Sequence, residues 1–173
     1  MKPLKSALAD FFKQHQIDIA DDLLEGVWIE DKEYKNDIYE QLFFVFEGYG
    51  VVLESEHGAS AEDGLSDVVL HFFDLINVEG WRIRLAKTIG KKVQFELAND
   101  NGNSHEFNVE VESSDWTPPE LFDELNKFAK LYADLSVIYL PVDDPYRIVA
   151  FPHAISDELL QLLNSYIKPY DVF

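Results

Sequence analysis

The alternation of apolar and polar residues in the middle of the chain restricts its fold more than any other feature. It occurs in Trp81–Leu85, Lys92–Leu97 and Glu106–Glu112. Successive side chains of a β-strand point to opposite faces, so each segment predicts a strand that is buried on one face and wet on the other. The connecting segments Ile89–Lys91 and Asn99–Asn103 contain glycine and asparagine, which favour tight turns. Together they predict three consecutive antiparallel strands.

The first of these strands predicts a basic outer face. Strict alternation places Trp81, Ile83 and Leu85 toward the core and Arg82 and Arg84 toward solvent. The stretch from residue 82 to residue 92 contains five cations and no acid. Both arginines are therefore candidate binding residues.

Acidic residues on the neighbouring strands are expected to lie on the same face. They are Glu96, Glu106, Glu110 and Glu112. A cross-strand ladder of opposite charges on a wet sheet face is the structural interpretation of this pattern. The functional interpretation is that the face receives a partner.

Helical periodicity flanks the strands. Apolar residues at three- and four-residue spacing predict helices over Leu4–His15, Leu65–Ile76, Leu121–Tyr132 and Ser156–Ile167, and Asp18–Glu25 favours a shorter helix. These helices supply the apolar surfaces that the strands need for burial.

Local signals predict where two of the helices begin. Thr117, Pro118 and Glu120 have the spacing of a capping box with proline at the first helical position. Ser156 is expected to cap the last helix, whose apolar face would include Leu160.

Two further hairpins are predicted. In Tyr39–Ser55, the apolar run Leu42–Phe46 predicts one strand and Val51–Leu53 the returning strand. Ser136–Leu140 and Tyr146–Phe151 predict the second pair.

The predicted fold is α+β, with an antiparallel sheet flanked by helices in the order α-ββ, then α-βββ-α-ββ-α. A length of 173 residues suits one domain over residues 1–173. Residues 1–64 would form a helix-and-hairpin extension ending in a polar loop at Glu56–Gly64, and residues 65–167 the core.

Charge restricts the choice of partner. The net charge is −19, and the acidic residues are spread along the whole chain. Such a field repels nucleic-acid phosphates and anionic membrane surfaces, and it favours a basic protein partner, although solubility alone also explains it. There is no cysteine, Asp10 interrupts the only leader-like apolar stretch, and no run reaches the ~18 residues of a membrane span. We therefore expect a cytoplasmic protein.

No motif for catalysis, cofactor or metal is found. Asn99–Glu110 has asparagines and a glutamate at calcium-loop positions, but Ser104 replaces the required glycine, so a polar hairpin is expected. His153, Ser156 and Asp157 are close in sequence, which does not make a triad because triads assemble in space. We predict no cofactor and no metal site, while a small enzyme that uses unrecognised carboxylates stays open.

A second candidate surface is aromatic. Trp28, Tyr34 and Tyr39 lie in a charged segment, where exposed aromatic residues are typical of interface anchors.

The order of elements from Leu65 to Ile167 resembles the type III secretion chaperone-like fold. That fold is found in small acidic secretion chaperones and in a related group of bacterial regulatory proteins. The hairpin of Val137–Leu140 with Ile148–Phe151, followed by the helix from Ser156, adds to the resemblance. It implies a non-catalytic protein, often a homodimer, that binds other proteins.

The expected function is therefore that of an acidic, non-catalytic protein-binding domain. It would act as a chaperone-like or adaptor protein for a basic or unfolded partner. The alternatives are an immunity protein that neutralises a basic toxin such as a nuclease, and the small carboxylate enzyme. A chaperone binds an extended segment, whereas an immunity protein binds a folded toxin with a strongly salt-dependent association rate.

Overall fold

The computed structural model describes residues 3–19, 42, 45, 46, 50–53, 61–111, 117–140 and 146–166. Its two three-stranded antiparallel sheets have the strand orders β1-β6-β5 and β2-β3-β4. The α+β prediction is therefore confirmed. The elements are α1 (Leu4–Gln14), β1 (Gly50–Leu53), α4 (Ala61–Ile76), β2 (Trp81–Ile89), β3 (Lys92–Asn99), β4 (Ser104–Glu110), α5 (Pro119–Tyr132), β5 (Leu135–Leu140), β6 (Tyr146–Pro152) and α6 (His153–Tyr166).

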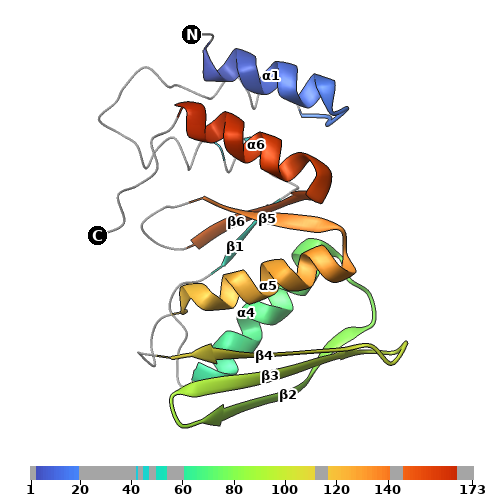
Figure 1. The fold of residues 1–173 in the computed structure, drawn as a ribbon, viewed down its shortest axis with the longest axis vertical. Coiled ribbons are helices and arrows are strands. Elements are labelled where there is room, and N and C mark those ends of the chain that lie inside the picture. The colour runs from blue at the N-terminus through green and yellow to red at the C-terminus, as the bar shows by residue number, and fades with distance from the viewer. Residues whose placement is uncertain are drawn as a thin grey trace.

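The sheets and helices alternate in layers along the long axis of the molecule (Figure 1). Helix α6 covers one face of the β1-β6-β5 sheet and α1 packs on α6, and α4 and α5 lie between the other face of this sheet and the β2-β3-β4 sheet. The outer face of the β2-β3-β4 sheet carries no further described layer. The molecule therefore has a helical end and an open-sheet end.

The β1-β6-β5 sheet is buried on both faces because its strands are apolar at successive positions. In β6, Val149 and Phe151 belong to the core cluster with α1 and α6, and Ile148 and Ala150 belong to the cluster with α4 and α5. A strand that is buried on both faces lacks the apolar–polar alternation of a half-wet strand. This sheet therefore joins the two core clusters.

The β2-β3-β4 sheet has the alternation expected of a half-buried sheet. In β3 and β4, Val93, Phe95, Leu97, Phe107 and Val109 are buried against the helices, and the residues between them are more exposed. The predicted meander, from residue 81 to residue 110, and its two turns are confirmed.

The hairpin predicted for Tyr39–Ser55 is wrong. Leu42 and Val45 are helical, and the Phe46 N–H donates to the Leu42 carbonyl at 3.0 Å. The strand at Gly50–Leu53 does form, but it pairs with β6. A short apolar run fits a buried helix as well as a buried strand, and here the spacing of the buried residues is that of a helix.

Three predicted helix starts are also corrected. Helix α4 begins at Ala61, inside the predicted loop. The N-cap of α5 is Pro118, one residue after the predicted Thr117, and Pro118 makes no side-chain capping bond. Ser156 lies inside α6, where its hydroxyl donates to the carbonyls of Phe151 and Pro152 at 3.2 Å each.

Three smaller points concern the exposure of Leu160, the described residues and the predicted N-terminal extension. Leu160 is 44% exposed, so it lies outside the buried face of α6. The helix predicted for Asp18–Glu25 lies outside the described residues, except for Asp18 and Ile19, which are not helical. Residues 1–64 contribute α1 and β1, which contact α6 and β6 of the predicted core.

Candidate protein-binding surface

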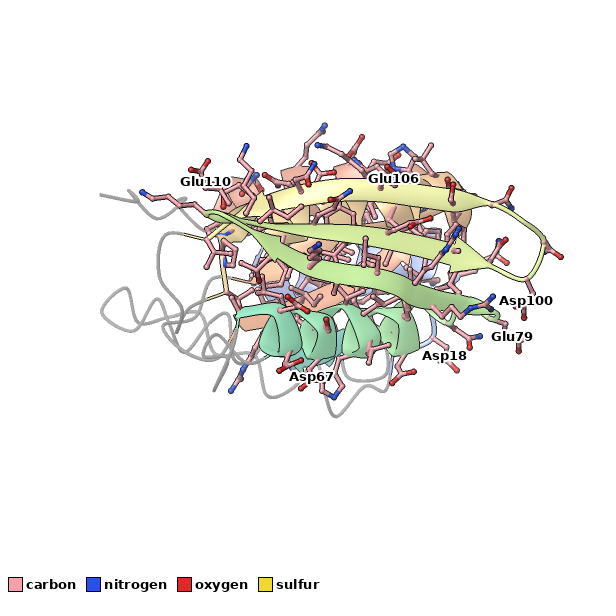
Figure 2. All side chains as sticks on the ribbon, turned by 90° about the horizontal axis from the view of Figure 1, so that it is seen from below. Asp18, Asp67, Glu79, Asp100, Glu106 and Glu110 are labelled. Carbon is pink, nitrogen blue, oxygen red and sulfur yellow. The ribbon has the colours of Figure 1, made fainter. Side chains whose placement is uncertain are left out.

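The candidate surface is the outer face of the β2-β3-β4 sheet. In Figure 2 this face is turned toward the viewer, and β4 with Glu106 and Glu110 borders it on the side away from α4. Antiparallel pairing aligns Glu96 with Glu106 and Lys92 with Glu110. These residues lie on the same face because they fall between the buried positions of each strand. The predicted common face of these glutamates is therefore confirmed for the described strands.

A β-bulge changes which residues of β2 reach this face. Ile83 pairs with Leu97 and Leu85 pairs with Glu96, so Arg84 is an extra residue without its own partner. A bulge shifts the alternation by one position. Leu85 therefore lies on the outer face, where it is 38% exposed, and its predicted core position is wrong.

The same shift exposes a second aliphatic side chain. Ile89 pairs with Lys92 on the outer face and is 55% exposed. Strict alternation could not reveal these two residues, because the bulge leaves no unambiguous signal in the sequence.

The charges on this face are only partly paired. Arg84 Nη1 lies 3.0 Å from Glu96 Oε1, whereas Arg82 pairs with Asp100 in the β3–β4 turn. Within the described residues, Lys87 and Glu106 form no ion pair. The predicted cross-strand ladder of opposite charges therefore forms between Arg84 and Glu96, and it does not extend to Lys87 and Glu106.

Charge also varies across the sheet. β2 carries exposed arginine and lysine residues, and β4 carries exposed glutamates. The face therefore changes from positive at β2 to negative at β4, although the whole chain has a net charge of −19.

A half-buried histidine lies beneath the sheet, opposite the candidate surface. His105 pairs with Leu97, and its ring lies among those of Phe107, Phe128 and Tyr132, with centroid distances of 5.5–5.9 Å. Its Nε2 is buried without a hydrogen-bond partner. Burial lowers the pKa of His105, and the nearby Glu124 partly opposes that shift. Alternation with Phe107 and the pairing register with Leu97 both place His105 on the inner face.

His153 does not pair with Ser156. Its Nδ1 lies 2.7 Å from the hydroxyl of Ser136, while the Ser156 hydroxyl faces backbone carbonyls. This contact joins the start of α6 to β5. Among the described residues, no group of three or more histidine, aspartate or glutamate side chains is arranged to hold a metal ion.

The remaining predicted site residues are Trp28, Tyr34, Tyr39 and Glu112. They lie outside the described residues, so the aromatic surface stays a prediction.

Comparisons with protein-family models, curated proteins and solved structures found no match. No helix in the described ranges combines the length and hydrophobicity needed to cross a membrane.

Proposed function

We propose that this chain is a non-catalytic, cytoplasmic protein-binding domain, chaperone-like or adaptor-like, for a basic or unfolded protein. One observation carries the proposal: the uncovered face of the β2-β3-β4 sheet combines exposed Leu85 and Ile89 with charges that are only partly paired. Apolar anchors surrounded by polar groups are the usual composition of a protein-binding surface.

The charge of the molecule supports a basic partner. Helix α4 carries Glu62, Asp63, Asp67 and Asp74 and no lysine or arginine, and it lies beside the open sheet (Figure 2). A field of this sign accelerates the encounter with a cationic protein, and contacts at the sheet then determine the lifetime of the complex. The element order from α4 to α6 also supports the resemblance to the type III secretion chaperone-like fold, which stays part of the proposal.

The test compares two variants of the tagged full-length chain in a pull-down from its native cells. Leu85→Ser/Ile89→Ser removes both anchors of the sheet face. Leu160→Ser removes an aliphatic side chain of similar exposure, 44%, from α6 and is the matched control. Because these leucines and Ile89 are exposed, each variant should keep its unfolding free energy within about 1 kcal/mol of wild type.

We expect wild type and the control to recover the same protein. The double variant should recover at least about tenfold less of it, since it lacks two aliphatic side chains that become buried in the complex. Recovery of no specific protein, or equal recovery by the double variant, would overturn the proposal.

The recovered partner also distinguishes the two protein-binding classes. A partner bound through an extended, protease-sensitive segment supports the chaperone-like function. A folded toxin domain, with an association rate that decreases steeply with salt, supports the immunity protein instead.

A further inference from the structure

The edge strands of the two sheets are covered to different extents. The outer N–H and C=O groups of an edge strand have no neighbouring strand, and proteins often cover them. At the β2 edge, the Thr88 N–H donates to the Glu62 carboxylate of α4 at 2.9 Å. At the β5 edge, the Val137 N–H donates to the Asn126 side chain of α5 at 3.0 Å. Side chains from the central helices thus occupy an outward donor on each of these edges.

Two backbone hydrogen bonds establish which groups of β4 point outward. The Val111 N–H donates to the Lys91 carbonyl at 2.8 Å, and the Asn99 N–H donates to the Asn103 carbonyl at 3.0 Å. Both pairs continue the β3–β4 register. Because hydrogen-bonded and non-hydrogen-bonded pairs alternate in an antiparallel ladder, the odd-numbered residues of β4 bond to β3. The even-numbered residues therefore direct their N–H and C=O groups away from the sheet.

The first of these outward positions is occupied, and the next three are not. The Tyr132 hydroxyl donates to the Ser104 carbonyl at 3.3 Å, which agrees with the derived register. For Glu106, Asn108 and Glu110, no part of the chain that the structure describes supplies a partner to these backbone groups. All three residues are exposed. The β4 edge is therefore an open template for one more strand.

The side chains at this edge select for positive charge. Glu106 lies directly opposite Glu96, and Arg84 is already paired with Glu96 at 3.0 Å. Like charges that face each other across a ladder are unfavourable, and an opposite charge beside them is favourable. A cation on the other side of Glu106 would therefore be stabilised, and Glu110 offers a second carboxylate on the same face, four residues along the strand.

We propose that the β4 edge binds an extended segment of the protein partner as a fourth strand, with lysine or arginine beside Glu106 and Glu110. Main-chain hydrogen bonds to residues 106, 108 and 110 supply affinity, and the two carboxylates supply selectivity. This inference rests on the proposed function, since it names the part of the partner that the sheet receives.

The probe is a synthetic eight-residue peptide that alternates valine with lysine and threonine, so that its lysines are four residues apart. The control peptide has glutamate in place of lysine. Exchange of the backbone amides of the full-length protein is followed by NMR, with and without each peptide. We expect the amides of Glu106, Asn108 and Glu110 to exchange rapidly in the free protein and to become protected with the lysine peptide only.

Asn108→Pro tests the backbone contact itself. Proline removes an N–H that points away from β3, so the existing ladder keeps its hydrogen bonds, and proline is tolerated at such edge positions. Asn108→Ala changes the same side chain and keeps the N–H. We expect the lysine peptide to bind Asn108→Pro about tenfold more weakly than wild type, and Asn108→Ala about equally.

Three results would overturn the inference: protection of these amides in the free protein, no protection with the lysine peptide, or equal affinity of Asn108→Pro and wild type. None of them affects the proposed function, because the pull-down with the Leu85→Ser/Ile89→Ser variant is read independently of β4. Loss of partner recovery in that pull-down is thus distinguishable from failure of strand addition.

Discussion

The two sheets of this molecule have the same number of strands and opposite environments. The β1-β6-β5 sheet packs against helices on both faces, whereas the described residues pack against only one face of the β2-β3-β4 sheet. In the first sheet, successive residues of β6 belong to the two core clusters, so substitutions there should change stability. In the part of the chain that the structure describes, nothing covers the outer face of the second sheet or residues 106–110 of its β4 edge, so substitutions there should change binding while stability is kept. The comparison separates the part of the chain that maintains the fold from the part available to a partner.

The largest expected effect lies in the doubly buried sheet. Phe151 in β6 is fully buried, and its ring meets that of Phe46 edge to face at 5.2 Å. Phe151→Ala removes this packing and leaves a cavity, which should cost about 3–5 kcal/mol of unfolding free energy. Urea denaturation followed by tryptophan fluorescence measures the change. Leu85→Ala on the open face is the matched comparison, with an expected cost below about 1 kcal/mol. Similar costs for the two variants would contradict the difference between the sheets.

The intermediate effect is a loss of stability in acid, and it depends on His105 on the inner side of the β2-β3-β4 sheet. Burial lowers the pKa of His105 below its ordinary value of 6.5, because the ring packs among aromatic side chains and Nε2 has no hydrogen-bond partner. Below pH 6.5 the unfolded chain therefore binds a proton more readily than the folded chain. The stabilising contribution of neutral His105 is complete above pH 6.5, decreases as the pH falls toward the folded pKa, and stays lost below it. Of the nearby charges on α5, Glu124 raises the pKa of His105 and partly opposes the shift, whereas Lys127 lowers it further.

The measurement compares unfolding free energies at several pH values for wild type and His105→Phe. The phenylalanine ring fits the aromatic surroundings and cannot titrate, so the acid-dependent loss should be smaller in the variant. His71→Asn removes an exposed histidine of α4 and is the matched control. Parallel pH profiles for wild type and His105→Phe would contradict the assigned role of His105.

The difference between the two sheets also explains how much of the fold could be predicted from the sequence. The half-wet strands β3 and β4 could be located closely, because each carries one apolar and one polar face. The run at Leu42–Phe46 was misassigned, because a short segment that is apolar throughout has no period that separates helix from strand. Ser156 has the sequence character of a cap, yet it lies inside α6 and its hydroxyl donates to carbonyls at the end of β6, because α6 begins directly after β6.

Parts of the candidate surface could also be predicted, because the half-buried strands carry one apolar and one polar face. Arg82, Arg84, Glu96, Glu106 and Glu110 share the outer face as alternation indicated. Leu85 and Ile89 could not be placed there in advance, since a bulge depends on how two strands pair and not on a local preference. The inward orientation of His105, by contrast, follows from its two-residue spacing from Phe107 in an alternating strand.

The smallest expected effect distinguishes a structural charge ladder from a surface kept open for binding. Arg84 and Glu96 are 3.0 Å apart, and their side chains are 67% and 21% exposed. In a double-mutant cycle with Arg84→Met and Glu96→Gln, an exposed pair of this kind should have a coupling energy below about 1 kcal/mol that decreases with added salt. If the coupling is this small, the face contributes little to the fold, and a partner can rearrange its charges at low cost. A coupling well above that value, unchanged by salt, would mean that the outer face is held together as a structural ladder, and Leu85 and Ile89 would then be incidental exposures beside it.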